Sequence, residues 1–405
     1  PALTTPDRPS LGGGGHAQAA PADVCRPQGV AVAGAPLPGG DNGRGMTTTL
    51  PQRIRSIDEL ITWLPYQLGH QPTQSLVLVA LTRGRLLGVC RIPLTNELAG
   101  EELGVDEVLD VVSGALKTLA REGSDQVHAV AYEEFPGQSG LAVGALEAAA
   151  QFMDVELAGL AVVHAGCRRL PWSTDPADRR GSPVQPVETC PAALHLLVDG
   201  QVPMPDRAAL RTLVHEDSTL SEPVRPALAR LVTRRSRRPA RAGRLWQRLL
   251  ADGGSPAQVA ALSGDDRAKL LASLADVHWR DAIIAWVAPG SLPLAALPAT
   301  ARAGLRTWLP DPVSDETAAL GKLMTLARSA PSDQPVCAHV CAVVGCIAWH
   351  LGNGATGRDA HERALIIDPA HRLARLGLRA IDLGMRPGDR PHPGSAAAVR
   401  PRPAV

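Results

Sequence analysis

The sequence predicts an α/β fold, a mixed sheet with packed helices, followed by an all-α helical domain. Up to about residue 172, short apolar segments with the period of strands alternate with amphipathic segments with the period of helices. Beyond about residue 192, apolar residues recur at helical spacing only. The length of 405 residues and the hydrophobic content of 45% allow each part to bury a core of its own.

The first part is expected to begin with a helix and a hairpin. Ser56 and the glutamate three residues later have the spacing of a capping box and predict a short helix. We expect this helix to end before Pro65, because proline disfavours helical geometry in the residue ahead of it. Two apolar runs, 75–81 and 86–94, flank Gly84, and glycine supplies the positive φ that a tight turn needs. These runs therefore predict a β-hairpin.

The remaining elements of this part continue the alternation. The pattern predicts a helix over 109–119, a strand over 127–132, a helix over 141–152, and strands over 155–164 and 167–172. An order of strand, strand, helix, strand, helix, strand and a final strand fits a mixed sheet with helices packed on it.

Composition divides the chain into five expected segments, which are 1–45, 47–172, 173–191, 192–385 and 386–405. The first is rich in Gly and Pro and cannot bury enough apolar surface to fold, so we expect a disordered or mis-annotated extension with Met46 as the natural start. The second is the mixed α/β domain and the third an irregular, proline-rich linker. The fourth is the helical domain, and the last is expected to be a disordered tail.

The helical domain is predicted to end in a tetratricopeptide-like helix pair. Gly345, Ala364 and Pro369 fall at the spacing of that motif's small residue, its alanine and its terminal proline, which let two helices pack closely and then turn. One such unit is visible, whereas stacked repeats need about three to bury a continuous core. The pattern fits a peptide-binding scaffold and also an ordinary helical hairpin.

Charge and cysteine usage exclude several classes of protein. The formal net charge is +1, so the whole molecule has no bias toward nucleic acid or acidic partners. Seven cysteines without a C-x-x-C spacing argue against a disulfide framework and a zinc ribbon, and favour a reducing compartment. No segment reaches the ~18 apolar residues that a spanning helix needs, and no signal-peptide pattern opens the chain. We therefore expect a soluble, cytoplasmic protein.

Three stretches carry a resemblance to a known family. The first is 64–81, the second is a helix that contains an Arg-Asp pair, and the third is the closing run 348–369. Their motif residues are Pro65, Tyr66, Gly69, Pro72, Ser75, Arg280, Asp281, Trp349, Gly352, Ala364 and Pro369. In this order and spacing the stretches resemble the actinobacterial domain-of-unknown-function family 4192 over roughly 47–388. The resemblance implies a bacterial protein and assigns no activity, so it transfers neither catalytic residues nor a cofactor.

A candidate ligand site lies in the loop that follows the strand over 127–132. Its residues are Glu133, Glu134, Gly137, Ser139 and Gly140. Open α/β sheets place ligands where strands lead into helices, and exposed backbone amides there can hold an anion. The loop lacks the second glycine of a nucleophile elbow, the lysine of a phosphate-binding loop and the full dinucleotide pattern. A plain turn is the alternative interpretation.

The densest basic run is a candidate nucleic-acid site. It contains Arg234, Arg235, Arg237, Arg238 and Arg241. The planar guanidinium suits phosphate because it donates two parallel hydrogen bonds. Of the aromatic residues that could stack on bases, only Trp246 is nearby. A solvated surface or interdomain loop is the alternative interpretation.

Several other polar residues have structural interpretations. Cys337 and Cys341 share a helix face, whereas Cys346 and His339 point elsewhere, which argues against a metal site on this helix. In the Arg-Asp pair of the second family stretch, we expect Asp281 to stabilise the first helical turn through the helix macrodipole and Arg280 to pair with a neighbouring element. A functional ion pair is the alternative interpretation. His70 has no carboxylate placed near it by the sequence, so we interpret it as a loop-packing residue.

The sequence thus supports three functional hypotheses, in descending order. The first is a non-enzymatic interaction or regulatory scaffold that binds a protein partner through its helical domain. The second, the alternative, is an α/β small-ligand binding protein or enzyme for a nucleotide or metabolite. The third is nucleic-acid binding through the Arg-rich segment 230–248. Whether the protein is an enzyme is left open, and so is any cofactor.

Overall fold

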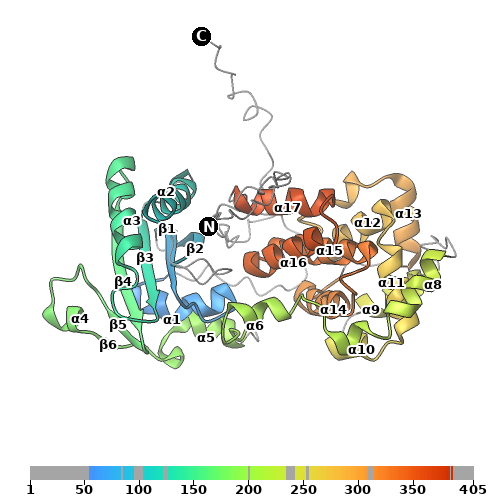
Figure 1. The fold of residues 1–405 in the computed structure, drawn as a ribbon, viewed down its shortest axis with the longest axis horizontal. Coiled ribbons are helices and arrows are strands. Elements are labelled where there is room, and N and C mark those ends of the chain that lie inside the picture. Colours follow the sequence, from blue (N-terminus) through green and yellow to red (C-terminus); the bar gives the residue numbers. More distant parts are fainter. Residues whose placement is uncertain are drawn as a thin grey trace, which may run out of the picture.

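The computed structural model describes residues 54–83, 85–94, 104–121, 124, 126–198, 201–233, 242–251, 255–308, 313–383 and 385. The predicted extension 1–45 and the tail 386–405 lie outside these residues. Figure 1 shows a sheet with its helices at one end of the molecule and a larger group of helices at the other. The predicted fold class is confirmed in this arrangement, a mixed sheet with packed helices followed by a predominantly helical region.

The sheet contains six strands within the described residues. They are β1 (Ser75–Thr82), β2 (Arg85–Pro93), β3 (Gln126–Glu133), β4 (Leu157–His164), β5 (Cys167–Arg169) and β6 (Ser182–Pro183). Their order across the sheet is β2-β1-β3-β4-β5-β6. β3 and β4 are parallel, and the other neighbours are antiparallel. The predicted hairpin is the β1–β2 pair, although Gly84 in its turn lies outside the described residues.

Both faces of the sheet are covered because successive side chains of a strand point to opposite faces. β1 is buried along nearly its whole length. Its even-numbered residues pack with α2 (Val105–Arg121) and α3 (Gly140–Met153), and its odd-numbered residues pack with α1 (Ile57–Leu68) and α5 (Pro191–Val198). Figure 1 shows these two helix pairs on opposite sides of the sheet. The uninterrupted apolar run of β1 is therefore the signature of a central strand.

The first helix continues through Pro65, and the prediction that it ends before this residue is wrong. A proline inside a helix has no N–H to donate to the carbonyl four residues earlier, which is that of Ile61. Here the hydroxyl of Tyr132, on β3, donates to that carbonyl over 3.4 Å. The helix ends instead at Gly69, whose φ of 75° is the left-handed conformation typical of a helix C-cap.

The connection over 173–191 contains more regular structure than its composition suggests. It includes α4 (Pro176–Arg180), β6 and η1 (Val187–Thr189). Asp175 caps α4 by accepting a hydrogen bond from the Ala177 amide at 2.7 Å. Arg168 on β5 then pairs with Asp178 at 2.6 Å and ties α4 to the sheet. Proline content predicted a break here, but local capping and a charge pair order the segment.

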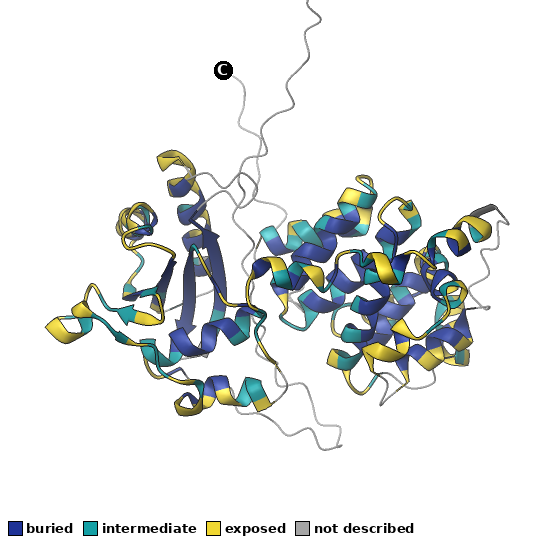
Figure 2. Ribbon diagram, turned by 60° about the horizontal axis from the view of Figure 1, so that its bottom comes forward, coloured by how far each residue is buried: buried dark blue, intermediate teal, exposed yellow. Residues whose placement is uncertain are grey.

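The helical region surrounds one large apolar core, formed by residues from 214 to 374. Its elements are α6 (Arg207–Thr212), α7 (Ser218–Ser221), α8 (Arg225–Thr233), α9 (Gly243–Leu250), α10 (Pro256–Ala260), α11 (Gly264–Ser273), α12 (Val277–Val287), η3 (Leu294–Ala296), α13 (Ala299–Trp308), α14 (Glu316–Arg328), η4 (Pro335–Cys337), α15 (Ala338–His350), α16 (Gly354–Ile367) and α17 (Arg372–Asp382). Figure 2 shows buried residues gathered at the centre of this region and, separately, along the strands. None of the described helices has the length and apolar character needed to cross a bilayer.

The last helices pack at very close range. A Cβ added to Gly345 on α15 would lie 2.5 Å from Cε1 of His361 on α16, and one added to Gly377 on α17 would lie 2.2 Å from Nε2 of the same ring. The imidazole of His361 is therefore held between two glycines. Ala364 is fully buried in the same pair of helices. The small residues that suggested a close-packed pair in the sequence lie at this contact.

Candidate functional site

A cavity of about 750 Å³ opens at the edge of the sheet where β3 and β4 end. Because these strands are parallel, their carboxyl ends meet at one edge, which is where open α/β sheets usually place ligands. β1 is antiparallel to β3, so the segment 71–74 that precedes it reaches the same edge. The end of α1 and the residues Pro205 and Asp206 complete the wall. The cavity therefore combines the start of the first family stretch, the predicted ligand loop and the chain leading to α6.

Both tyrosines of the chain line this cavity. Tyr66 belongs to the family stretch, and Tyr132 is the penultimate residue of β3. The Tyr132 hydroxyl is buried and donates to the Ile61 carbonyl, as described above. Burial raises the pKa of Tyr132 far above its ordinary value. Tyr132 is therefore a neutral, fixed part of the wall.

Glu133 occupies the backbone amides that the sequence offered to an anion. Its carboxylate accepts hydrogen bonds from the Gly137 amide at 3.1 Å, the Ser139 amide at 3.0 Å and the Ser139 hydroxyl at 2.7 Å. The Glu133 side chain is only 2% exposed, and Arg169 lies 3.5 Å away. Gly140, the remaining residue of the predicted loop site, begins α3. The loop 133–140 is thus closed on its own carboxylate.

The charge state of Glu133 follows from these contacts. Burial alone would raise the pKa of the carboxyl, but the Ser139 hydroxyl, the amides of Ser139 and Gly137, and Arg169 together outweigh it and lower the pKa below its ordinary value. Glu133 is therefore ionised near neutral pH and serves to order the loop.

Replacing Glu133 with Ala should lower the free energy of unfolding by at least about 2 kcal/mol. The change leaves the buried Ser139 hydroxyl and two amides without their charged acceptor, and each such loss costs about 1–3 kcal/mol before relaxation. Urea denaturation measures the effect. Glu156→Ala, which removes an exposed carboxylate from the same part of the chain, is the control and should change stability little. Equal effects of the two changes would contradict the ordering role of Glu133.

Two further carboxylates line the cavity in more exposed positions. Glu134 accepts a hydrogen bond from the side-chain amide of Gln74, and its own backbone amide donates to Gln138 Oε1 at 2.8 Å. Asp206 caps α6 by accepting from the Ala209 amide at 2.6 Å. Of these two, only Glu134 was among the site residues predicted from the sequence.

His164 ends β4 and also lines the cavity. Its Nδ1 lies 3.2 Å from the backbone carbonyl oxygen of Glu133. A carbonyl oxygen only accepts hydrogen bonds, so Nδ1 carries a proton, and the tautomer with its proton there leaves Nε2 as an acceptor. The sequence placed His164 at a strand end but gave no reason to single it out.

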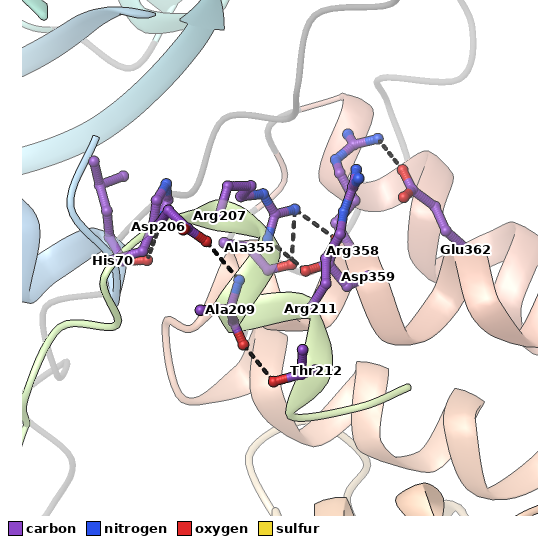
Figure 3. Close-up of polar contacts among 11 residues, drawn as sticks. His70, Asp206, Arg207, Ala209, Arg211, Thr212, Ala355, Arg358, Asp359 and Glu362 are labelled. Carbon is purple, nitrogen blue, oxygen red and sulfur yellow. Dashed lines mark hydrogen bonds and ion pairs between the residues drawn. The ribbon is translucent and has the colours of Figure 1, made fainter. Parts of the chain in front are cut away.

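The chain that walls the cavity leads directly into the helical region. The Gln71 amide donates to the Met204 carbonyl at 2.8 Å, and the Met204 amide donates to the Gly69 carbonyl at 2.9 Å. Arg207, the first residue of α6, then makes two hydrogen bonds to the carboxylate of Asp359 on α16, one of them 2.6 Å long. Figure 3 shows this connection from His70 through Asp206 and Arg207 to Asp359.

His70 lies within this connection. Its side chain is buried, and Nδ1 lies 3.1 Å from the Leu68 carbonyl oxygen. Gly69 adopts a positive φ beside it, and its neighbour Leu210 belongs to α6. This position, inside the junction of the two parts, suits the packing role that the sequence suggests.

The other family-motif residues divide between the two parts. Pro65 and Pro72 line the cavity, whereas Ser75 is buried at the start of β1. Arg280 and Asp281 form an ion pair of 2.7 Å on α12. Residues of the third stretch belong to the close-packed last helices or their ends, and they are Trp349, Gly352, Ala364 and Pro369. The cavity thus collects motif residues of the first stretch alone.

The predicted nucleic-acid residues Arg234, Arg235, Arg237, Arg238 and Arg241 lie outside the described residues. Next to them, Arg230 pairs with Asp265 at 2.7 Å. Within the part of the chain that the structure describes, no group of three or more His, Cys, Asp or Glu side chains could hold a metal ion.

Reasoning from the sequence missed Tyr132, His164 and Asp206 as members of one cavity. One signal was available, because a chain with only two tyrosines carries them at a helix end and a strand end. Neither position reveals from the sequence that the two rings share a wall. The cavity arises from pairings between segments far apart in the chain.

Comparison with curated proteins and with solved structures gives no match for this chain. A family model described as "Domain of unknown function (DUF4192)" matches residues 58–388. This range contains the whole cavity wall and the last helices. On this match, the chain belongs to the DUF4192 family.

Proposed function

We propose that this protein binds a small polar molecule in the cavity at the strand ends, and that the effect of binding is transmitted to its helical region. The observation that carries the proposal is the convergence of Tyr66, Glu134, His164 and Asp206 on one cavity. Its volume of about 750 Å³ lies in the range of small-molecule sites, roughly 300–1,000 Å³. Of the hypotheses that the sequence supports, a small-ligand binding protein agrees best with this geometry.

The proposed coupling rests on the position of Asp206. This residue lines the cavity, and the next residue along the chain is Arg207, which binds Asp359 on α16. A ligand that contacts Asp206 therefore acts on the residue adjacent to the buried ion pair that joins α6 to α16. We propose that the α/β domain is the sensing unit and that the helical domain responds to it.

The interaction scaffold remains a second candidate because the last helices expose apolar side chains. Ile366, Leu376 and Leu383 are each more than half exposed. Exposed apolar side chains at the end of a helical array suit a protein partner, although single ones are also ordinary surface features. In this arrangement a protein partner would bind the last helices and respond to the conformation of the helical region. We retain the cytoplasm as the proposed location because of the cysteine pattern.

A thermal-shift screen against a mixed set of metabolites tests the binding function. A ligand at 100 times its Kd adds about 2.7 kcal/mol of stability. Thr73→Trp places bulk in the cavity from an exposed position, and Lys117→Trp places the same bulk on exposed α2, which packs on the opposite face of the sheet. We expect at least one compound to stabilise the wild type and Lys117→Trp but not Thr73→Trp. A screen without any such compound would contradict the proposal.

A further inference from the structure

We infer that the ligand of this cavity is an organic cation, a small molecule that carries an ammonium or guanidinium group. The inference rests on the proposed binding function and goes beyond it by naming the chemical class. It follows from which hydrogen-bonding groups of the wall are already used and which are left for a ligand.

Several side-chain donors of the wall are committed to other protein groups. The Tyr132 hydroxyl donates to the Ile61 carbonyl, and the Thr62 hydroxyl lies 2.9 Å from the Gln185 carbonyl, to which it donates. His164 donates from Nδ1 to the Glu133 carbonyl, and Gln74 donates its amide to Glu134. Each hydroxyl or ring then has a lone pair left, and a lone pair accepts hydrogen bonds. These groups therefore offer acceptors to a ligand, which suits one rich in N–H donors.

The charged side chains of the wall also favour a cationic ligand. Among the described residues that line the cavity are the carboxylates of Glu133, Glu134 and Asp206, and none of these described residues is a lysine or an arginine. Glu133 is compensated by Arg169 and by the loop amides. Among the described residues, the partners of Glu134 and Asp206 are neutral amides, those of Gln74 and Ala209. Within the part of the chain that the structure describes, these two carboxylates therefore face the cavity without a cationic partner, and a bound cation would pair with them.

The aromatic residues add a second kind of attraction for a cation. Tyr66 and Tyr132 are the only tyrosines in the sequence, and both line the cavity. The face of a tyrosine ring carries negative charge density and attracts ammonium and guanidinium groups, by about 0.5–2 kcal/mol. Carboxylates together with tyrosine rings form a wall that favours positive over neutral ligands.

A phosphate or nucleotide suits this site poorly. Phosphate binding needs converging N–H donors, and the start of α3 is the place where the fold would supply them. The amides of Gly137 and Ser139 there already bind the Glu133 carboxylate. A phosphate would have to displace this buried carboxylate while facing Glu134. Thus, within the small-ligand hypothesis, the metabolite is favoured over the nucleotide, and a cationic metabolite over an anionic one.

The test measures binding of matched probes by isothermal titration calorimetry near neutral pH. The cations are cadaverine, agmatine, spermidine and choline; 1,5-pentanediol and glutarate are the neutral and anionic counterparts of cadaverine; and adenosine monophosphate represents nucleotides. We expect at least one cation to bind at least tenfold more tightly than every neutral or anionic probe. That binding should weaken at high salt, because screening reduces charge attraction.

Variants assign the binding to the cavity. Glu134→Gln and Asp206→Asn keep the shape of each side chain, and asparagine is as good a helix cap as aspartate. Each should weaken cation binding about tenfold, whereas Asp110→Asn, which removes an exposed carboxylate on α2, should leave it unchanged. Thr73→Trp should abolish it.

The outcomes separate the two proposals. Tighter binding of the diol, glutarate or the nucleotide at the Thr73-sensitive site would overturn the cation inference and support the binding function. Failure of all four cations, with a metabolite from the screen bound at that site, would do the same. Failure of every probe and of the screen would overturn both. Cation binding that Glu134→Gln and Asp206→Asn leave unchanged would also overturn the inference.

Discussion

Replacing Asp359 with Ala is expected to lower the free energy of unfolding by about 3–5 kcal/mol, because it leaves Arg207 charged and unpaired in a buried position. The Asp359 side chain is 1% exposed and that of Arg207 is 10% exposed. Arg211 lies 3.4 Å from the same carboxylate. Burial raises the pKa of Asp359, against the pull of Arg207 and Arg211. Urea denaturation followed by circular dichroism measures the loss.

An exposed ion pair of similar length provides the control. Arg230 and Asp265 are 2.7 Å apart, with side chains 58% and 60% exposed. Asp265→Ala should cost less than about 1 kcal/mol, because solvent screens such pairs. The double change Arg207→Met with Asp359→Leu should recover part of the loss, since it removes both buried charges together. If Asp359→Ala costs no more than Asp265→Ala, the buried ion pair does not hold α6 against α16.

Acidification below about pH 6.5 is expected to destabilise the last helices through His361. Burial, with contributions from His371 and Arg358, lowers the pKa of His361 to about 3, well below the ordinary 6.5. Between these two values the unfolded chain binds a proton that the folded chain does not. Stability contributed by this group is therefore complete above pH 6.5 and is lost as the pH falls toward 3. Each pH unit in this window costs about 1.4 kcal/mol, so a fall from 6.5 to 4.5 costs roughly 3 kcal/mol.

The surroundings of the His361 ring explain why it does not bind a second proton in the folded state. The ring of His361 is fully buried between Gly345 and Gly377, and within the described residues neither of its nitrogens has a hydrogen-bond partner. His339 and His371 also have lowered pKa values, so they contribute to the loss of stability in acid in the same way. Burial and the neighbouring His371 lower the pKa of His339 to about 4, and burial also lowers that of His371.

Variants at position 361 isolate the contribution of this ring. The free energy of unfolding should be measured against pH for the wild type, His361→Leu and His361→Phe. Both variants remove the titrating group, and Phe keeps a planar ring in case Leu packs poorly. We expect a shallower slope between pH 6.5 and 4.5 in each folded variant, whatever its stability at pH 7. An unchanged slope in a variant that folds would show that other groups cause the acid sensitivity.

Local patterns in the sequence were sufficient for most of the fold. The buried run of β1, the alternation that follows it and the change to helical spacing predict the mixed sheet and the helical region. Gly345 and Ala364 lie where their spacing suggests, because close helix packing depends on small residues at helical intervals. The end of α1 was mispredicted because Pro65 is tolerated through Tyr132, and no local pattern reports that distant hydroxyl.

Only part of the site could be predicted from the sequence. The loop after β3 was identified by its position at a strand end, and Glu133 and Glu134 do line the cavity. Their roles differ, however, because Glu133 turns back to bind the loop that was expected to bind an anion. Asp206 joins them through the pairing of Met204 with Gly69 and Gln71, which involves backbone groups alone. Such a pairing leaves no side-chain signature to recognise.

The pairing of Met204 with the segment 69–71 also sets the order in which a growing chain can complete its fold. Thr62 on α1 donates to the carbonyl of Gln185, which is synthesised 123 positions later. The segment 69–71 pairs with Met204, which is synthesised later still. Arg207 can form its ion pair only after Asp359, 152 positions further on, has been synthesised. Domains generally fold in the order of their synthesis. On the ribosome, the strands therefore emerge well before the cavity can close, and the buried ion pair is one of the last contacts to form.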